Sequence, residues 1–281
     1  MRKLETIAKM KSVCRGATRE GKTLGFVPTM GALHEGHLSL VRTSRVQCDV
    51  TAVSIFVNPL QFGPSEDLEK YPRTLQRDAA TLEEMGVDFL FAPSVAEMYP
   101  PGAQTHVEVG ELSGKLDGAS RPGHFRGVAT VVCKLFEIVR PHRAYFGQKD
   151  AAQVAVLRKM VRDLSIDVEM VVCPIVREAD GLAMSSRNVY LSPDERRVAP
   201  VLSRSLHLAE ELYEAGERDA GLMRARISAL IAPEPLASID YVSVADAESL
   251  EELTTVDRPA LVSLAVRFGR TRLIDNTTLG T

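Results

Sequence analysis

Short apolar segments alternate with helical patterns over residues 1–175, and this alternation constrains the fold of the 281-residue chain more than any other feature. The apolar segments are nearly continuous, which is typical of parallel strands that helices cover on both faces. They are Thr23–Val27, Thr51–Val57, Val87–Phe91, Arg143–Phe146 and Val168–Val172. Between the third and fourth lies an apolar stripe with helical spacing, formed by Val128, Val131, Val132, Leu135, Phe136 and Val139. The pattern predicts an α/β fold with a doubly wound, parallel, Rossmann-like sheet.

After Cys173-Pro174 the pattern changes. The run Ser192-Pro193-Asp194-Glu195 is a capping box with proline at the first helical position, and it predicts a helix that extends towards Gly216. A second helix is predicted over Ala220–Ile231. Three antiparallel strands are predicted after it, at Ile239–Val244, Ala260–Arg267 and Arg272–Ile274. We therefore expect two domains, residues 1–175 and a smaller α+β domain at residues 176–281.

The composition excludes several classes of protein. A net charge of -3 and a pI near 6.1 argue against a broad nucleic-acid-binding surface, which needs an excess of basic residues. No segment approaches the roughly 20 consecutive apolar residues that span a bilayer. The cysteines are widely spaced, with no CxxC pair: Cys14, Cys48, Cys133 and Cys173. These features predict a reduced, cytoplasmic protein that binds neither nucleic acid nor membrane.

The run Gly16–Thr23 matches the phosphate-binding P-loop pattern GxxxxGK[ST]. A P-loop needs a strand before it and a helix after it. Here the order is reversed, because an amphipathic helix with Leu4, Ile7, Ala8 and Val13 precedes the run and a strand follows it. The run is therefore interpreted as the end of a helix and a turn.

The tetrad His34-Glu35-Gly36-His37 follows the first predicted strand. Two histidines three residues apart lie on one face at the start of a helix, where free backbone N–H groups and the helix dipole favour anions. A pair of metal ligands or two structural histidines are the alternatives, although no third His or Cys stands nearby to complete a metal site. A second group of donors, Met184-Ser185-Ser186-Arg187, suggests a nucleotide held from two sides.

The run from Pro28 to His37 resembles the HxGH signature of a nucleotidyltransferase superfamily that includes class I aminoacyl-tRNA synthetases. Four further runs narrow the resemblance: Phe56–Phe62, Tyr71–Thr74, Phe146–Asp150 and Arg177–Asn188. In this order and spacing, the chain resembles the pantothenate synthetase (pantoate–β-alanine ligase) family over essentially its whole length. One departure is visible, because Ala151 and Ala152 precede Gln153 where the family often carries Gln-Gln.

This resemblance implies a two-step, ATP-dependent condensation of (R)-pantoate with β-alanine to form pantothenate, in vitamin B5 and coenzyme A biosynthesis. Pantoate would attack the α-phosphorus of ATP to give pantoyl adenylate and pyrophosphate, and the amine of β-alanine would then displace AMP. The resemblance also implies Mg²⁺ on the phosphates and a homodimer.

The resemblance assigns the catalytic work to His37 as proton donor, together with His34, Lys149, Ser185, Ser186 and Arg187. The implied ATP-binding residues are Met30, Gly31, Ala32, Leu33, His34, Glu35, Gly36 and His37; Gly147, Gln148, Lys149 and Asp150; Val176; and Met184, Ser185, Ser186 and Arg187. Asp78 is the expected metal residue, and Asp150 lies near the metal as well.

The implied residues for pantoate and β-alanine are Met30, Asn58, Gln61, Phe62, Tyr71, Arg121 and Gln153. Two neutral glutamines favour a small hydroxy acid, because a phosphorylated acceptor calls for more Lys or Arg. The segment Arg121–Phe125 is equally consistent with a structural loop that leads into the next helix. A lid formed by residues 62–71 is a hypothesis.

Two other functions remain open at this point. One is another HxGH nucleotidyltransferase, which passes a nucleotidyl group to a phosphorylated acceptor. The other is a catalytically silent nucleotide-binding or metal-binding module, which would not need His34, His37, Lys149, Ser185 and Ser186 together. An aminoacyl-tRNA synthetase is disfavoured, because no anticodon-binding domain or basic patch is evident.

Overall fold

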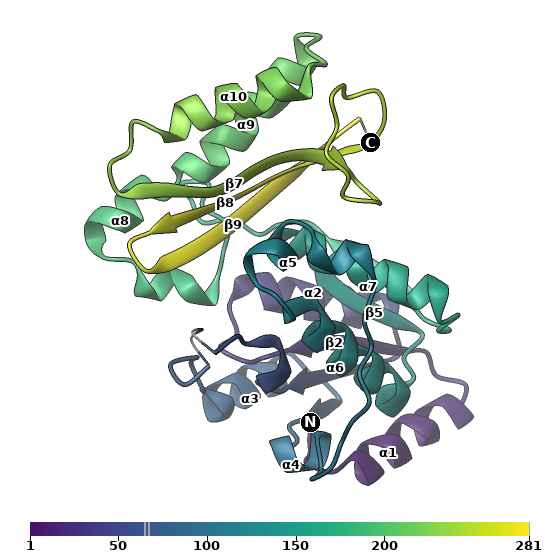
Figure 1. The fold of residues 1–281 in the computed structure, drawn as a ribbon. Helices are drawn as coiled ribbons and strands as arrows, with labels where there is room; N and C mark the ends of the chain where they lie inside the picture. The colour runs from purple at the N-terminus through teal and green to yellow at the C-terminus, as the bar shows by residue number, and fades with distance from the viewer. Residues whose placement is uncertain (65, 67, 281) are drawn as a thin grey trace. The chain divides into compact units, whose positions relative to one another are not determined.

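The computed structural model describes residues 1–64, 66 and 68–280, which form two compact units (Figure 1). Unit 1 comprises Met1–Gly114, Arg121–Gly147 and Val156–Cys173. Unit 2 comprises Lys115–Ser120, Gln148–Ala155 and Pro174–Thr281. Two short segments from the middle of the chain thus belong to the unit that contains the C-terminal third. Independent domains at residues 1–175 and 176–281 stay a prediction.

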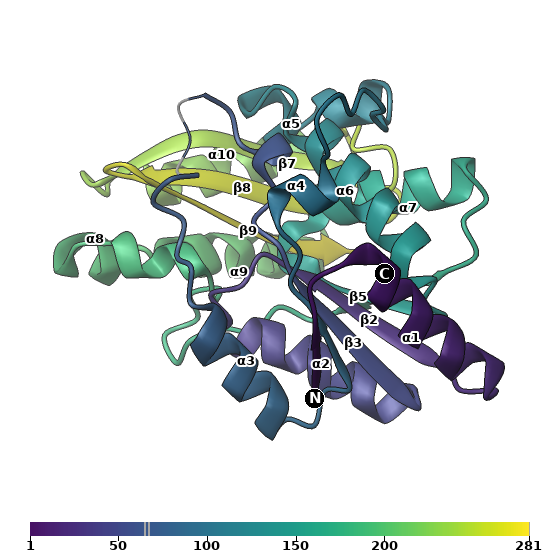
Figure 2. The same cartoon turned by 90° about the horizontal axis from the view of Figure 1, so that it is seen from below.

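Unit 1 is built on a parallel sheet of six strands among the described residues, in the order β1-β4-β3-β2-β5-β6. The strands are β1 (Arg2–Leu4), β2 (Leu24–Thr29), β3 (Val50–Ile55), β4 (Phe89–Phe91), β5 (Arg143–Gly147) and β6 (Glu169–Cys173). From β2 the chain builds outward through β3 and β4, and it then returns to add β5 and β6 on the other side (Figure 2). The predicted doubly wound sheet is confirmed, and its order reverses between β2 and β5.

Helices join these strands. They are α1 (Ile7–Arg19), α2 (Glu35–Gln47), α3 (Leu75–Glu84), α4 (Val95–Met98), α6 (His124–Val139) and α7 (Ala151–Asp163), with the 3₁₀ turns η1 (Pro59–Gln61) and η2 (Glu111–Gly114). The apolar stripe that predicted a helix lies in α6 and is largely buried. Gly16 lies inside α1, and the chain turns through Gly21 at φ 75° before β2 begins. The helix-then-strand order that excludes a P-loop is confirmed.

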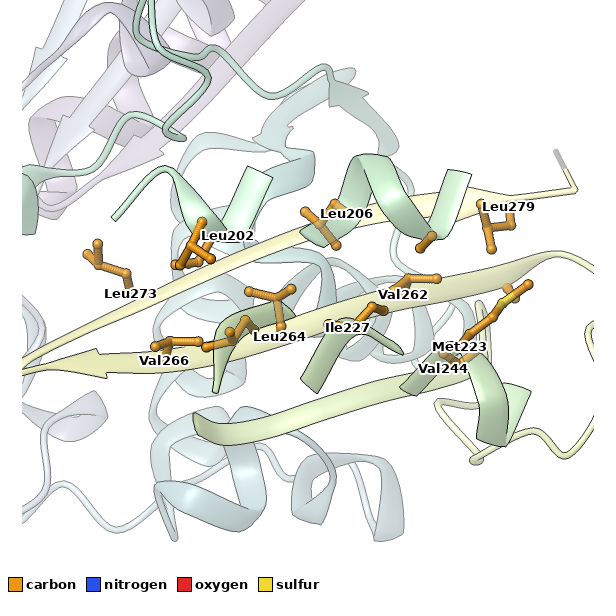
Figure 3. Packing of buried hydrophobic residues seen from close by; sticks show 14 of the residues in the cluster. Leu202, Leu206, Met223, Ile227, Val244, Val262, Leu264, Val266, Leu273 and Leu279 are labelled. Carbon is orange, nitrogen blue, oxygen red and sulfur yellow. The ribbon is translucent and has the colours of Figure 1, made fainter. Parts of the chain in front are cut away.

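Unit 2 contains an antiparallel sheet of β7 (Ala237–Asp246), β8 (Ala260–Phe268) and β9 (Thr271–Leu279). Its helices are α5 (Asp117–Ser120), α8 (Pro193–Val198), α9 (Val201–Glu214) and α10 (Ala220–Ile231), with the 3₁₀ turns η3 (Gln148–Asp150) and η4 (Ser186–Tyr190). The helices α9 and α10 pack on one face of the sheet (Figure 3). Leu206, Ile227, Val262 and Leu264 are among the buried residues of this core.

Three elements differ from the prediction. The short strand β1 was not predicted, and its Leu4 was wrongly assigned to the following helix, which begins at Ile7. The strand β9 extends well beyond the predicted Arg272–Ile274. The helix predicted from Ser192 towards Gly216 divides into α8 and α9 at Pro200, because proline lacks an N–H group to continue the helical hydrogen bonds. Its capping box is confirmed, since Ser192 N donates to Glu195 Oε2 at 2.8 Å and Glu195 N donates to Ser192 Oγ at 3.3 Å.

In the part of the chain that the structure covers, no helix has the length and hydropathy that a membrane crossing requires. The predicted lid at residues 62–71 includes Ser65 and Asp67, which lie outside the described residues.

Candidate active site

The predicted site residues follow the carboxyl ends of neighbouring strands. β2 and β3 pair in parallel with Thr29 opposite Ile55, so the loops after both strands begin at the same edge of the sheet. The first loop leads to His34 and the second leads to Asn58. β5 ends at Gly147, directly before η3. Ligands of doubly wound sheets bind at this edge, near the point where the strand order reverses.

The loop before α2 makes a tight left-handed turn. Gly31 has φ +84° and Ala32 has φ +50°. A Cβ atom on Gly31 would lie 3.0 Å from Ile55 Cγ2 and 3.1 Å from Asp78 Oδ2, so the position suits only glycine. The turn sets His34 at the N-cap of α2, where the His34 carbonyl already accepts from His37 N at 2.8 Å. The earliest N–H groups of a helix have no acceptor within it.

The two histidine rings lie against each other, with centroids 4.1 Å apart. The backbone N–H of His34 donates to His37 Nδ1 at 3.4 Å. A Cβ atom on Gly36 would lie 2.9 Å from His34 Cε1, so the glycine leaves room for the imidazole. The tetrad therefore places two imidazoles and the N-terminus of α2 in one place, as its spacing predicts. This combination favours an anionic group such as a phosphate.

Asp78 is buried in the first turn of α3, with 2% of its surface exposed. Its Oδ2 atom accepts hydrogen bonds from Ala32 N at 2.8 Å and from Thr74 Oγ1 at 3.1 Å. Its Oδ1 atom accepts from Leu33 N at 3.1 Å. The carboxylate therefore fixes the backbone of the loop that carries His34, and it accepts the N–H groups of Ala32 and Leu33, two residues predicted to bind ATP.

A cluster of amide side chains lies after β3. Asn58 Nδ2 donates to Gln61 Oε1 at 3.1 Å, and Gln61 Nε2 donates to Met30 Sδ at 3.0 Å. Asn58 is 1% exposed and Gln61 is 9% exposed, so both amides are oriented by their surroundings. The structure thus brings together three of the residues predicted to bind pantoate, and the ring of Phe62 packs edge-on against Tyr71 with centroids 5.8 Å apart.

Two residues that were not among the predicted site residues hold this cluster, although the loop that begins at Tyr99 was predicted to form a rim or lid of the site. Tyr99 Oη donates to Asn58 Oδ1 at 2.9 Å, and the Gly127 carbonyl accepts from Asn58 Nδ2 at 3.1 Å. A Cβ atom on Gly127 would lie 2.2 Å from the Leu60 carbonyl oxygen, so only glycine allows α6 to approach η1 this closely. The glycine within the apolar stripe of α6 was the available signal, because glycine inside a helix often marks a close approach.

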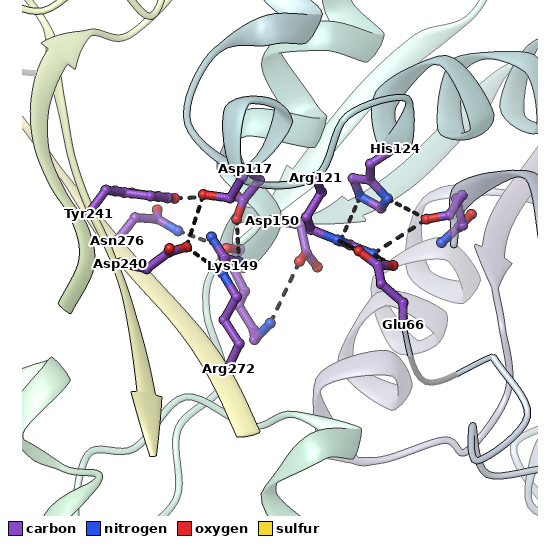
Figure 4. Close-up of polar contacts among 12 residues, drawn as sticks. Glu66, Asp117, Arg121, His124, Lys149, Asp150, Asp240, Tyr241, Arg272 and Asn276 are labelled. Carbon is purple, nitrogen blue, oxygen red and sulfur yellow. Dashed lines mark hydrogen bonds and ion pairs between the residues drawn. The ribbon is translucent and has the colours of Figure 1, made fainter. Parts of the chain in front are cut away.

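Arg121 is held by side chains of unit 1 (Figure 4). Its guanidinium donates to both carboxylate oxygens of Glu66 at 2.7 Å and contacts His124 Nε2 at 3.0 Å. Burial opposes ionisation of Glu66, but the bonds and charge of Arg121 prevail and lower the pKa of this carboxyl below its usual range. His124 Nδ1 in turn bonds to the Gln61 carbonyl at 2.8 Å. Arg121 is thereby connected to the backbone of the amide cluster.

The remaining predicted site residues lie in unit 2. Lys149 and Asp150 form part of η3, and Lys149 Nζ lies 3.6 Å from Asp150 Oδ1. Gln153 follows in the first turn of α7. Met184 N donates to the Val176 carbonyl at 3.0 Å, which pairs two residues predicted to contact the nucleotide. Ser185 caps η4 by accepting from Arg187 N at 3.2 Å. The pairing of Gln61 with Gln153 around one pantoate stays a prediction.

Among residues 1–64, 66 and 68–280, no group of three or more His, Cys, Asp or Glu side chains is arranged to hold a metal ion.

Comparisons with known proteins agree with this arrangement. A family model for pantoate–β-alanine ligase matches residues 2–278. A pantothenate synthetase from Acidobacterium capsulatum is 60% identical over 291 residues, covering 100% of this chain and 97% of the relative. A pantothenate synthetase from a Roseiflexus species is 61% identical over 279 residues, covering 99% of each chain.

Solved structures agree as well. The crystal structure of pantothenate synthetase from Thermus thermophilus matches with a TM-score of 0.93 and 48% identity, over 99% of each chain. A pantoate–β-alanine ligase from Francisella tularensis, complexed with "Beta-gamma ATP and Beta-alanine", matches with a TM-score of 0.78 and 35% identity, over 99% of this chain and 97% of that one. By the extent of these matches, the chain belongs to the pantoate–β-alanine ligase family.

Proposed function

We propose that the chain condenses pantoate with β-alanine at the expense of ATP, through pantoyl adenylate, and that its predicted site residues serve both steps. In the first step a carboxylate oxygen of pantoate bonds to the α-phosphorus while the bond between the α-phosphorus and the bridging oxygen to the β-phosphorus breaks, which releases pyrophosphate. In the second step the β-alanine nitrogen bonds to the acyl carbon and loses a proton, and AMP leaves.

The first step concentrates negative charge around the phosphates, so the protein must position donors and stabilise charge. His37 donates a proton or hydrogen bond to the departing pyrophosphate, and His34 supports it from the N-cap of α2. Lys149, Ser185 and Ser186 bind the β- and γ-phosphates, and Arg187 orients the segment that carries the serines. The His34 and His37 rings lie against each other, which supports the roles assigned to these two histidines.

One observation carries the choice of acceptor: the buried Gln61 amide donates to the thioether sulfur of Met30. A thioether is a weak acceptor, so a carboxylate or hydroxyl oxygen of pantoate would replace that contact with a stronger hydrogen bond. Asn58 donates to the oxygen of the same amide and holds it in place. Met30 and Phe62 supply apolar surface for the gem-dimethyl group, and Tyr71, Arg121 and Gln153 complete the proposed acid pocket.

We propose that Mg²⁺ binds together with ATP, because the ion would neutralise charge on the ATP phosphates. The donor set fits an ion that keeps its phosphate and water ligands, and Asp150, whose side chain is half-exposed beside Lys149, would lie near the ion. Asp78 fits a direct ligand poorly, since both of its oxygens accept hydrogen bonds and the residue is buried. The family resemblance further supports a homodimer in the cytoplasm.

The proposal is tested by phosphorus NMR on the purified protein with ATP, Mg²⁺ and pantoate, with and without β-alanine. Steady formation of AMP and pyrophosphate is expected only when both substrates are present. Transfer of a nucleotidyl group to a phosphorylated acceptor would instead give pyrophosphate without AMP. The absence of AMP under every combination would overturn the proposed substrates.

The role of His37 is tested in the same assay. His37→Ala is expected to retain the fold and to lose adenylation by about 100-fold or more, the range of general acid catalysis. His207→Ala is the matched control, because His207 is exposed on α9 beside Glu210 and Glu211. A His37→Ala protein with wild-type turnover would refute the role assigned to this histidine.

A further inference from the structure

Two adjacent polar residues of β9, Asp275 and Asn276, are buried, with 1% and 3% of their surfaces exposed. Burying a carboxylate or an amide costs free energy unless each is fully hydrogen-bonded. The hydrogen-bond partners of Asp275 and Asn276 therefore indicate the role of these two residues. Both bind segments that carry the phosphate-binding residues of unit 2.

Asn276 bonds to the turn that carries Lys149 (Figure 4). Its Nδ2 atom donates to the Gln148 carbonyl at 3.0 Å and to the Lys149 carbonyl at 2.9 Å. Its Oδ1 atom accepts from Gln148 Nε2 at 3.0 Å. Because a side-chain amide has two N–H groups, both of its donors are spent on η3.

Asp275 bonds to the segment that leads into the second phosphate-binding run. Its oxygens accept from Arg177 Nη1 at 2.6 Å and from Arg177 Nη2 at 3.0 Å, a two-point contact. Arg177 also donates to the Gly181 carbonyl at 3.0 Å and forms a β-bridge with Ala183, directly before Met184. Burial raises the pKa of the Asp275 carboxyl even though Arg177 opposes the shift.

We propose that Asp275 and Asn276 are positioning residues that hold the Lys149 turn and the Met184–Arg187 segment in one fixed arrangement within unit 2. Asn276 acts through the backbone of Lys149, and Asp275 acts through Arg177. The inference rests on the proposed function, in which both segments bind the phosphates of one ATP. The proposal gives neither positioning residue a contact with the nucleotide, because the hydrogen-bonding groups of both side chains already bind protein partners.

Stability alone is a weak reason for burying Asp275 and Asn276 in β9. A buried ion pair can often be replaced by apolar residues of similar volume without loss of stability, and the facing residue of β8 opposite Asp275 is the apolar Leu264. What an apolar pair would lose is directional bonding to two separate segments. Asn276 and the Lys149 carbonyl lie 127 residues apart in sequence, and the Asn276 side chain makes this connection.

The test compares Asn276→Ala with Thr277→Val, a control on the same strand that loses the 2.5 Å hydrogen bond to Glu210 but does not face η3. Steady-state kinetics would give kcat and KM for each substrate, with circular dichroism and Tm for the fold. Asn276→Ala is expected to lower kcat/KM for ATP by about 100-fold, the cost of misplacing a positioned group. Thr277→Val is expected to stay within about twofold of wild type.

A second comparison separates positioning from a general structural effect. In a Lys149→Ala background, Asn276→Ala is expected to lower the remaining activity by less than about threefold, because residues that act as a unit are not additive. A full loss of about 100-fold in both backgrounds would overturn the role through Lys149. For Asp275, Asp275→Asn is compared in the same way with and without Ser186→Ala.

The outcomes distinguish the two proposals. If wild-type protein forms no pantothenate, the proposed function fails. If wild-type protein is active and folded Asn276→Ala keeps its kcat/KM for ATP, the inference fails alone. Should Asn276→Ala not fold, Asn276→Ser, which keeps one donor, is measured instead, and an intermediate loss is expected; wild-type kinetics in that variant would also overturn the inference.

Discussion

At the scale of single residues, Asp78 shows how a buried charge can shape the loop that carries predicted site residues. Three hydrogen bonds converge on its buried carboxylate, two of them from the backbone of Ala32 and Leu33. Hydrogen bonds to a charged acceptor are stronger than neutral ones, so the left-handed turn before His34 is held firmly. The geometry of the histidines therefore depends on a residue of another helix.

Asp78→Asn tests this dependence. The asparagine amide has the same shape, but its NH₂ group would face at least one backbone N–H donor and leave it unsatisfied. We expect kcat to fall by about 100-fold while the Mg²⁺ concentration for half-maximal activity stays unchanged. Titration of activity with Mg²⁺ makes the measurement.

A direct metal ligand would give a different result, because loss of the carboxylate would raise the Mg²⁺ requirement. Asp88→Asn is the matched control, since Asp88 Oδ2 accepts from Thr51 N at 2.9 Å, at the start of β3 and away from the site edge. This control is expected to keep wild-type kinetics.

Single residues were predictable where the information is local. The tetrad at residues 34–37 predicted two histidines on one face at a helix start, and the structure has that geometry. The hydrogen bonds from Ala32 and Leu33 to Asp78 were not predictable, because they join residues 46 and 45 positions apart. Residue type does not reveal which buried carboxylate reaches which backbone.

At the scale of elements, the close approach of α6 to η1 determines where the amide cluster lies. Gly127→Ala would put a methyl group against the Leu60 backbone, which cannot move as a flexible side chain can. We expect a loss of about 2 kcal/mol of stability from this overpacking and a raised KM for pantoate. Denaturant unfolding and steady-state kinetics would measure the two effects.

Gly16→Ala is the control for that substitution. Gly16 also lies inside a helix of unit 1, but a Cβ atom there meets nothing within 4 Å and φ is not positive. Alanine is expected to stabilise α1 by about 0.5–1 kcal/mol without changing the kinetics. Equal behaviour of the two variants would argue against close approach as the reason for Gly127.

Strands and helices were predictable where their buried residues are apolar. The central strands β2 and β3 are buried almost throughout, so their nearly continuous apolar sequence was sufficient to predict them. The strand β9 was predicted too short, because Asp275 and Asn276 are polar although buried. The division at Pro200 was missed, because apolar residues continue at helical spacing through α9.

At the scale of the whole molecule, unit 2 owes part of its stability to a segment from the middle of the chain. Arg272 of β9 donates to Asp117 Oδ1 at 2.6 Å and to Asp240 Oδ2 at 2.7 Å. Ser120 Oγ also donates to Asp240 Oδ2, at 2.9 Å. All four side chains belong to unit 2, and no local pattern in the sequence indicated that Lys115–Ser120 joins it.

Arg272→Met is expected to destabilise the protein by about 3 kcal/mol, because it leaves two largely buried carboxylates without their cation. The control is Arg226→Met on the exposed side of α10, expected to stay within about 0.5 kcal/mol of wild type. Urea unfolding at neutral pH would measure both. Equal stabilities of the two variants would contradict the importance of this network.

The same network predicts a pH dependence. Burial opposes ionisation of Asp240, but Arg272 and Ser120 prevail and lower its pKa below the usual range. A lowered carboxyl pKa adds stability that is present above the unfolded value of about 3.9 and is lost as pH falls through the folded value. The stability difference between wild type and Arg272→Met should therefore shrink below about pH 4.

The hydrogen bonds from β9 to a turn much earlier in the sequence have a consequence for synthesis of the protein. A ribosome releases the turn at residues 148–150 long before it releases Asn276, which lies 127 residues beyond Lys149. The six strands that the structure describes in unit 1 are complete by residue 173, so its sheet can form while the nascent chain is still growing. The Lys149 turn is not fixed in this way until β9 has been synthesised. Activity should therefore appear late and abruptly during translation, and nascent chains released before β9 should be inactive even when unit 1 has folded.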